Sequence, residues 1–504
     1  MLDQPIMAID RRTPGPLYRK LKNEILRRIR LGVLRPGDRL PPTRQLALEL
    51  GVNRGTVSAA YDELTGDGIL ESHVGRGTFV AALIPLEPLA PGDRPPGYRW
   101  PDHFAGVHPP EPRNYPSTGD KPVIALHRNI PDESLFPTDG FRESLNEVLR
   151  NGGRSLLSYA PVGGHPEFLS FLREYLRENR RLEVGPGEML VVNGSQQALD
   201  LIGRAFLRPG DTVLVEDPTY TGALEMFEAL SARPVGVSTD EGGIRLEDTE
   251  RLFARERPKF IYVMPTFQNP TGVSLASGRR EALVRLAARY EIPVIEDDFD
   301  GELHYDGEAP PPLKSGPDSQ GVIYIGTPSK MLFPGLRIGW ILAEEPVIER
   351  LGRIKQVADL SGSQLLPAAF ARFAITGGLE RHKEKVRAAY RARRDALLGA
   401  LERHMPRGCT WSRPAGGMTL LVTLPAPVDF DALLENTARE GVLFTPGPWF
   451  YVSGGDRELR LCFGSVAEEA VEPGVIVLAR EVRRALERGG RPLPARRKPS
   501  LPSV

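Results

Sequence analysis

The chain has 504 residues, and its 65 lysines and arginines balance its 65 aspartates and glutamates. This length exceeds one ordinary domain, and the balanced charge excludes a nucleic-acid contact that rests on overall charge. The two cysteines lie at no metal-ligand spacing, which excludes a disulfide scaffold. The chain has no signal-peptide pattern and no apolar run of membrane-spanning length, which excludes a secreted precursor and a membrane protein. We therefore expect a cytoplasmic chain without a metal site.

Residues 12–81 predict a small domain that begins with two helices. The first helix lies within residues 16–32, because four apolar residues recur on one face at helical spacing: Leu17, Leu21, Ile25 and Ile29. The second helix lies within residues 40–51, and Gly51 ends it.

A third helix follows after a short turn. Asn53 can cap it, and its inward stripe consists of Val57, Tyr61 and Leu64. Two short helices joined by a tight turn are typical of a helix-turn-helix.

A hairpin is predicted directly after the third helix. Its strands are Ile69–Val74 and Thr78–Val80, and its tip is Gly75-Arg76-Gly77. The helices and this hairpin together predict a winged helix-turn-helix.

Arginines stand where such a fold meets DNA. Four of them fall at helix starts and at the hairpin tip: Arg39, Arg44, Arg54 and Arg76. There they can contact phosphates, while the first turn of the third helix offers Arg54 and Thr56 to base edges. Gly77, together with Gly75, lets the hairpin backbone approach a groove closely. A protein-interaction domain with ordinary surface arginines is the alternative.

Two segments lack any sustained apolar period. Residues 82–122 are dense in proline and predict a semi-extended tether, on which Trp100 and Phe104 can dock against a domain. Residues 491–504 form a basic, proline-rich tail.

Residues 123–490 carry an ordered series of motifs at the ends of strand-like runs. NGSQQALDL places a Gly-Ser turn with Ser195 and Gln196 at a helix start, where free N–H groups suit a phosphate. EDPTY offers the ring of Tyr220, and FQNPTG offers the amide of Asn269.

The series continues with a carboxylate, a lysine and an arginine. IEDDFD presents Asp297 at a strand end. GTPSKMLFPGLRIG contains Thr327, Ser329, Lys330 and Arg337, and its lysine is well placed to be desolvated and to form a Schiff base with an aldehyde. Phosphate cradle, ring, amide, carboxylate, lysine and arginine are the parts that hold pyridoxal phosphate (PLP).

Each motif alone has a simpler explanation. The Gly-Ser turn can be a helix cap, Tyr220 a core aromatic, residues 296–298 a solvated strand end, and Arg460 a surface arginine. Their joint order favours a cofactor site.

This order resembles the class I/II aminotransferases of PLP fold type I, from Leu126 to the region of Arg460. The resemblance implies that Lys330 carries the internal aldimine. It also implies that Asp297 keeps the pyridinium nitrogen protonated and that Asn269 hydrogen-bonds the ring hydroxyl.

The resemblance implies roles for further residues. Tyr220 would stack on the ring, and the other cofactor-binding residues would be Ser195, Gln196, Thr327, Ser329 and Arg337. Arg460, in LRLCFG, matches the arginine that binds a substrate carboxylate bidentately. Tyr159, in SYAPVGGHPEFL, matches the tyrosine that reaches the neighbouring subunit's phosphate, so a homodimer is expected.

One position departs from the family pattern. A tyrosine usually follows the aspartate and meets the ring oxygen, but Phe299 stands there. A phenyl ring donates no hydrogen bond, so we expect at most weak transaminase activity unless a water or Tyr305 substitutes.

The N-terminal motifs GDRLPPTRQLA, RGTV and GRGTF resemble the GntR family. A GntR-like head before an aminotransferase-like body is the layout of the MocR/GabR-type bacterial regulators, which the chain resembles in both parts. The implied fold is a winged helix-turn-helix linked to a large, mostly parallel α/β domain and a small α+β C-terminal lobe.

The implied function is a regulator that binds promoter DNA with two half-sites and senses a small amine or amino acid through the Lys330 aldimine. Arg460 favours an effector with a carboxylate, although PLP itself is another candidate signal. A working aminotransferase with a DNA-binding appendage and a scaffold that no longer binds PLP are the alternatives.

Overall fold

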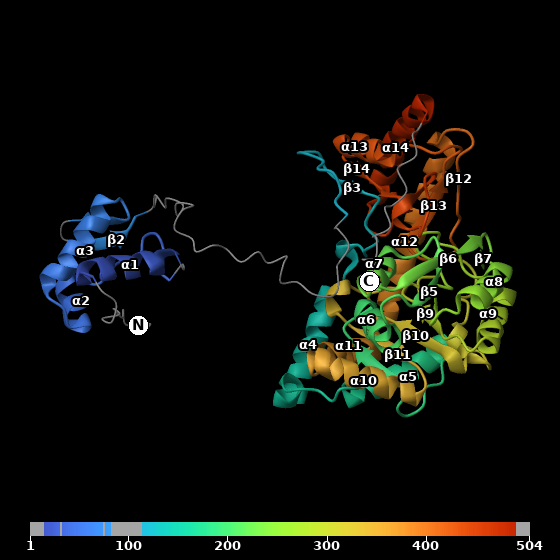
Figure 1. The fold of residues 1–504 in the computed structure, drawn as a ribbon, viewed down its shortest axis with the longest axis horizontal. Coiled ribbons are helices and arrows are strands. Elements are labelled where there is room, and N and C mark those ends of the chain that lie inside the picture. Colours follow the sequence, from blue (N-terminus) through green and yellow to red (C-terminus); the bar gives the residue numbers. More distant parts are fainter. Residues whose placement is uncertain (1–14, 31–32, 74–75, 82–112, 490–504) are drawn as a thin grey trace. The chain divides into compact units, whose positions relative to one another are not determined.

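The structure is a computed structural model that describes residues 15–30, 33–73, 76–81 and 113–489. The chain divides into two compact units, Met1–Ala105 and Gly106–Val504 (Figure 1). Some predictions concern residues outside the described ranges: Gly75 at the hairpin tip, Trp100 and Phe104 in the tether, and the tail at 491–504.

The N-terminal unit contains the predicted helices and hairpin. Its elements are α1 (Leu17–Arg30), α2 (Thr43–Leu50), α3 (Arg54–Gly66), β1 (Leu70–His73) and β2 (Gly77–Val80). Gly51 ends α2 with a left-handed φ of 60°, and the Asn53 side chain accepts a hydrogen bond from Gly55 N at 2.9 Å where α3 begins. The apolar faces close one core, which includes Leu21, Ile25, Val57, Tyr61 and Leu64.

The wing contains a third segment beside its two antiparallel strands. Arg39 forms a bridge with Phe79, and Leu40 N donates to Thr78 O at 2.9 Å. Gly77 has a φ of 111°, and a Cβ there would lie 2.9 Å from Nε of Arg39. The predicted DNA-contacting residues Arg39 and Gly77 are therefore direct neighbours.

An eight-stranded sheet of order β4-β11-β10-β9-β8-β5-β6-β7 forms the centre of the second unit. Its strands are β4 (Met189–Val192), β5 (Thr212–Asp217), β6 (Arg233–Asp240), β7 (Gly243–Ile244), β8 (Ile261–Val263), β9 (Val294–Asp297), β10 (Val322–Gly326) and β11 (Gly339–Leu342). Strands β10, β9, β8, β5 and β6 are parallel, whereas β11 is antiparallel to both β10 and β4. The mostly parallel sheet is thereby confirmed.

Helices precede, join and follow these strands. They are α4 (Thr138–Gly152), α5 (Pro166–Arg180), α6 (Ser195–Phe206), α7 (Thr221–Ala229), α8 (Leu246–Glu256), α9 (Ser277–Arg289), α10 (Glu345–Asp359) and α11 (Leu365–Ile375). Short 3-10 helices lie at η2 (Glu133–Leu135), η3 (Gly153–Leu157), η4 (Leu313–Ser315), η5 (Ser319–Gly321), η6 (Pro334–Leu336) and η7 (Gly447–Trp449). Strands β4 and β10 are buried along their whole length, which explains why they are continuous apolar runs in the sequence.

A second, antiparallel sheet of order β12-β13-β16-β15 builds the C-terminal lobe. The lobe contains α12 (Gly378–His404), β12 (Thr410–Trp411), β13 (Thr419–Thr423), α13 (Phe430–Arg439), β14 (Val442–Leu443), β15 (Thr445–Pro446), β16 (Glu458–Cys462) and α14 (Glu468–Arg488), and β14 pairs with β3 (Ile124–Ala125).

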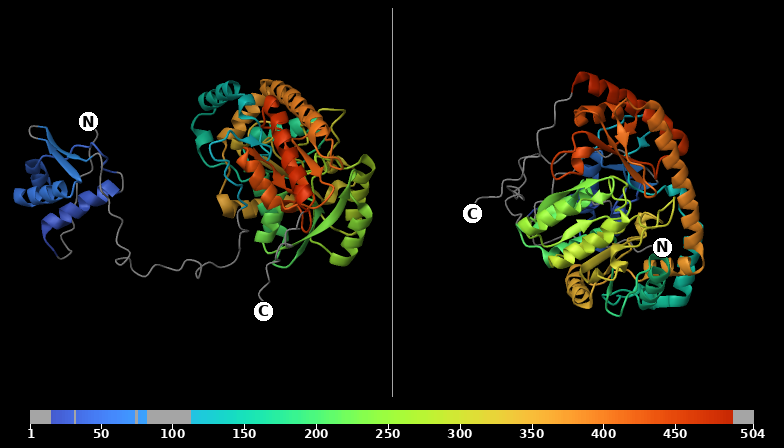
Figure 2. Two further views of the ribbon diagram at one scale, coloured as in Figure 1. Left: turned by 90° about the horizontal axis from the view of Figure 1, so that it is seen from above. Right: turned by 90° about the vertical axis from the view of Figure 1, so that its right-hand side faces the viewer.

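Within the second unit, α13 and α14 gather at one end and α10 and α11 at the other (Figure 1). The long helix α12, orange in Figure 2, runs along one side. In the described ranges, no helix is both long enough and apolar enough to cross a lipid bilayer.

Candidate cofactor site and nucleic-acid surface

The parallel strands β5, β8, β9 and β10 bring four predicted residues to one edge of the sheet. Asp297 is the last residue of β9, and Tyr220 lies between β5 and α7. Asn269 follows β8, and Lys330 follows β10. The carboxyl ends of parallel strands share one edge, so a ring, an amide, a carboxylate and an amine meet there.

The predicted phosphate cradle consists of the turn between β4 and α6 together with an arginine. Gly194 has a φ of 84°, and a Cβ there would lie 2.9 Å from Nη2 of Arg337. This Nη2 donates to Asn193 O at 2.7 Å. Ser195 is half-buried at the first turn of α6, and Gln196 beside it is exposed. A helix N-terminus and a guanidinium group lie together, which favours an anion.

The turn before Lys330 is fixed by side-chain hydroxyls. Thr327 Oγ1 donates to Ile338 O at 2.7 Å and lies 2.7 Å from Oγ of Ser329. The turn is therefore tied to the segment that carries Arg337 into β11.

Asp297 has one bonded and one unbonded oxygen. Tyr262 donates its hydroxyl to Oδ2 of Asp297 at 2.8 Å, whereas Oδ1 is buried and has no hydrogen-bond partner among the described residues. Burial raises the pKa of Asp297 to about 7, and the hydrogen bond from Tyr262 opposes this rise. A protonated pyridine nitrogen would offer Oδ1 both a hydrogen bond and a positive charge.

Lys330 is half-buried, and its Nζ donates to Asn129 O. Burial lowers the pKa of Lys330, while the negative charge of Asp300 opposes this shift. A lowered pKa increases the neutral fraction that acts as a nucleophile. Asp300 itself is buried, burial raises its pKa to about 7, and neither of its oxygens has a partner in the described part of the chain.

Arg460 is only 7% exposed in β16, so the surface-arginine alternative is wrong. Its Nη1 donates to Asn269 Oδ1 at 3.1 Å, and its Nη2 donates to His127 O at 2.6 Å and to Thr445 Oγ1 at 3.0 Å. The ring of Phe450 lies 4.8 Å from the guanidinium carbon. Asn269 therefore retains its Nδ2 as a donor while its oxygen holds Arg460.

Tyr220 and Phe299 border the same core cluster, and both are half-buried. Burial and the nearby Asp297 raise the pKa of the Tyr220 hydroxyl. Tyr305, which the sequence offered as a substitute hydroxyl for Phe299, donates to Gly417 O instead. Phe299, at the position where the family has a tyrosine, thus offers only a hydrocarbon side chain.

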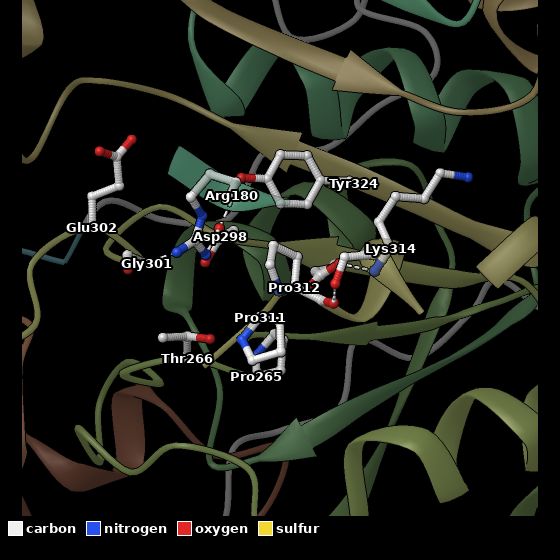
Figure 3. A network of polar contacts seen from close by, with 12 residues as sticks. Arg180, Pro265, Thr266, Asp298, Gly301, Glu302, Pro311, Pro312, Lys314 and Tyr324 are labelled. Atoms are coloured by element: carbon white, nitrogen blue, oxygen red, sulfur yellow. Dashed lines mark hydrogen bonds and ion pairs between the residues drawn. The ribbon is translucent and has the colours of Figure 1, made fainter. Parts of the chain in front are cut away.

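A buried polar network supports the turn after β9. Arg180 and Tyr324 both donate to Oδ2 of Asp298, as Figure 3 shows, and Arg180 also donates to Gly301 O at 3.1 Å. Glu296 accepts from the backbone of η4. Residues 296–298 are all buried, so the solvated-strand-end alternative is also wrong.

Tyr159 is 79% exposed. A residue that serves a partner subunit must be exposed in this way. Sequence reasoning missed several neighbours of the site, namely His127, Asn129, Tyr262, Asp300 and Thr445. Asp300 was visible in the acidic motif, but His127 and Asn129 act through backbone carbonyls, which no side-chain pattern reveals.

The N-terminal unit presents its predicted contacts to solvent. The four arginines Arg39, Arg44, Arg54 and Arg76 are exposed. Thr56 is half-buried in the first turn of α3. Exposed arginines beside a wing and a helix start suit the phosphate backbone of DNA.

Two family profiles match the chain. The profile for aminotransferase class I and II covers residues 121–476, and the profile for bacterial regulatory proteins of the gntR family covers residues 17–80.

Some relatives match nearly the whole chain. The probable rhizopine catabolism regulatory protein MocR of Rhizobium meliloti is 31% identical over 496 residues, which are 96% of this chain and 97% of that protein. The uncharacterized HTH-type transcriptional regulator YisV of Bacillus subtilis is 31% identical and covers 94% of this chain and 98% of its own.

A further relative matches a smaller share of the chain. The aromatic-amino-acid aminotransferase 1 of Thermococcus litoralis is 36% identical over 73% of this chain and 89% of its own.

Solved structures match the second unit. A multiple substrate aminotransferase from Thermococcus profundus has a TM-score of 0.70 and 35% identity, covering 74% of this chain and 94% of its own. The alpha-aminoadipate aminotransferase LysN of Thermus thermophilus, complexed with N-(5'-phosphopyridoxyl)-L-leucine, has a TM-score of 0.70 and 32% identity, covering 77% and 99%.

Aminotransferases of this class depend on PLP, and the unpaired Oδ1 of Asp297 and the cradle around Gly194 fit that cofactor. The gntR-type winged helix is a DNA-binding domain. The chain therefore belongs to the class I and II aminotransferase family and, through its N-terminal unit, to the gntR family, in the arrangement that it shares with MocR-type transcriptional regulators.

Proposed function

We propose that this protein is a cytoplasmic homodimer that binds two half-sites in promoter DNA and senses a small amine or amino acid at Lys330. The observation that carries the proposal is the union, in one chain, of a gntR-type winged helix and a class I and II aminotransferase domain, with MocR-type relatives alike over nearly their whole length.

The proposed site assigns each residue a separate task. PLP, when bound, supplies an aldehyde that amines join covalently. Lys330 offers its amine, Asp297 accepts the pyridine N–H, and Asn269 donates Nδ2 to the ring hydroxyl. Tyr220 covers the ring, and the remaining cofactor-binding residues are Ser195, Gln196, Thr327, Ser329, Arg337 and the partner's copy of Tyr159.

Recognition of the effector uses its two ends. Arg460 binds the carboxylate, and the effector's amine takes the place that Lys330 otherwise holds. Release of Lys330 occurs only when the effector is bound. The protein with Lys330 held and the protein with Lys330 released therefore differ in interaction free energy, and this difference can shift the equilibrium between two conformations.

A working aminotransferase is the second candidate. Lys330, Asp297 and Arg460 lie together, and relatives of 35–36% identity carry aminotransferase names. Phe299 argues against efficient turnover, because the ring oxygen loses a hydroxyl donor.

The deciding experiment measures DNA affinity and the absorbance of bound PLP while a panel of amines and amino acids is added. We expect the compound that shifts the absorbance to change affinity for a native promoter fragment, and Lys330→Ala to abolish both responses. Sustained formation of a 2-oxo acid, with DNA affinity indifferent to every amine, would favour the aminotransferase instead.

A further inference from the structure

Residues 113–117 are the first described residues of the second unit, and this segment contacts the neighbours of Arg460. We infer that Arg113 and Tyr115 are positioning residues for Arg460 and that carboxylate binding at Arg460 loosens their attachment. The second part of this inference rests on the proposed function. The segment is covalently continuous with the chain that leads to the DNA-binding unit. Its attachment to the second unit can therefore transmit to that chain whether a ligand occupies the site at Arg460.

Tyr115 reaches Arg460 through one intervening side chain. Its hydroxyl lies 2.9 Å from Oγ1 of Thr445, the same oxygen that accepts from Nη2 of Arg460 at 3.0 Å. Thr445 Oγ1 also donates to His127 O at 3.4 Å. A hydroxyl has one proton and two lone pairs, so Tyr115 and Arg460 can both donate to Thr445 while Thr445 donates to His127. This assignment uses all three bonding positions.

Aromatic packing adds to this attachment. The ring of Tyr115 lies 4.3 Å from the ring of His127 and 5.2 Å from that of Trp449, measured between centroids. Both His127 and Thr445 are direct acceptors of Arg460. Tyr115 is therefore in contact with two of the groups that hold the guanidinium.

Arg113 provides a second connection. Its Nη1 donates to Trp449 O at 2.6 Å, its guanidinium carbon lies 5.6 Å from the Trp449 ring, and its Nε lies 3.6 Å from Glu225. Trp449 directly precedes Phe450, whose ring lies under Arg460. The segment thus reaches Arg460 by two routes.

The geometry of the guanidinium explains why a carboxylate would disturb these contacts. A bidentate pair uses either Nε with Nη2 or Nη1 with Nη2, so both modes require Nη2. In Arg460 this atom already donates to His127 O and Thr445 Oγ1. A carboxylate therefore competes with the two groups that hold Tyr115, whereas Nε is buried without a partner among the described residues.

Tryptic cleavage after Arg113 in the full-length, PLP-loaded protein tests the positioning without any effector, because trypsin binds the arginine side chain and so requires its release from Trp449 O. Arg460→Gln and Thr445→Val should each speed the appearance of the product that begins at Asn114, measured by mass spectrometry, by about two- to tenfold, as expected for the loss of one hydrogen bond. Arg457→Gln is the matched control, since Arg457 is an exposed arginine that donates to Leu424 O and lies near the same strand. Unchanged cleavage after Arg113 in both site variants, with melting temperatures near that of the parent, would overturn the inference.

The reciprocal test uses the probe L-leucine and its amide, which lacks the carboxylate. Saturating L-leucine should speed tryptic cleavage after Arg113, leucine amide should not, and Tyr115→Phe should alter the affinity for L-leucine several-fold. Tyr290→Phe is the control, because its ring packs against Phe253 elsewhere in the second unit. L-leucine binding without faster cleavage after Arg113 would refute the transmission. Failure of the parent to bind any amine would count against the proposed function, and cleavage of the Arg460→Gln and Thr445→Val variants would still decide the positioning.

Discussion

The N-terminal unit and the body handle charge in opposite ways. Arg39, Arg44 and Arg54 stand exposed on a small apolar core, whereas Asp297 and Arg460 are buried beside unpaired polar atoms. Exposed arginines stay hydrated until DNA binds, so each contributes modestly to the free energy of binding, and salt weakens this contribution. Buried groups have already lost their water, so a ligand that pairs them is bound strongly. Changes in the body should therefore have larger effects than changes in the head.

The largest effect should come from the lysine. Lys330→Ala should abolish the PLP adduct that borohydride makes permanent in the parent, because no other amine occupies its position. Mass spectrometry of the reduced protein measures the adduct. Lys314→Ala is the control, since burial also lowers the pKa of Lys314 outside the site. A borohydride-stable adduct in Lys330→Ala would show that the covalent site lies elsewhere.

The next effect should come from the buried carboxylate. Asp297→Asn removes the charge that pairs with the pyridinium N–H, and the affinity for PLP should fall roughly 10- to 100-fold. Titration of the PLP-free protein with PLP, followed by absorbance, measures this loss. Equal affinities would mean that Asp297 does not contact the cofactor.

Substitutions in the N-terminal unit should have smaller effects on binding, and the effects of different arginines can be separated. Arg54→Ala should reduce the preference for the native promoter sequence by about 1–3 kcal/mol if Arg54 contacts a guanine. Arg76→Ala should weaken all sequences alike and reduce the salt slope by about 0.9. Arg27→Ala, which breaks an exposed pair with Glu24 on α1, is the control. If neither Arg54→Ala nor Arg76→Ala changed binding, these arginines would not face DNA.

A pH dependence should separate the two regions further. Burial raises the pKa of Asp300 to about 7, so the folded PLP-free protein binds a proton there that the unfolded chain has released. The contribution of Asp300 to the free energy of unfolding should therefore fall as the pH rises from about 4 to 7, by at most about 1.4 kcal/mol per unit, and stay level above that range. Asp300→Asn should remove this slope, which denaturant titrations at several pH values would reveal. A slope unchanged by the substitution would contradict the shift.

The smallest effect should come from the position that departs from the family. Phe299→Tyr restores a hydroxyl near the ring oxygen of PLP, so the pH midpoint of the cofactor's absorbance should move and slow transamination should increase. Spectral titration and single-turnover measurements test both. Rapid multiple turnover by the unmodified protein would show that Phe299 does not limit catalysis.

The sequence predicted the arrangement of the fold because its signals are local. The family resemblance carried by the ordered motifs implied the mostly parallel sheet, and Gly51 and Asn53 marked helix ends that the structure confirms. The meeting of Asp297 and Lys330 at one edge followed from parallel strand ends. The roles assigned to these residues stay predictions.

Other features depend on contacts between distant parts of the chain. The bond between Arg460 and Asn269 joins β16 of one sheet to the turn after β8 of the other, and no pattern within either motif encodes it. Nor did the proline-rich composition of residues 82–122 indicate that Tyr115 is held by Thr445. Such contacts depend on tertiary packing, which local spacing does not report.

The reversed direction of β11 has a consequence for how firmly a phosphate could be held. Because β11 runs antiparallel between β10 and β4, its first residue lies beside the last residue of β4, just before the start of α6. Gly339 lies opposite Val192, at the floor of the cradle. The floor of the cradle therefore opens only if the edge strand β4 separates from β11, so this opening should require partial unfolding of the sheet. By contrast, the attachment of Tyr115 is peripheral and can open while the sheet stays folded.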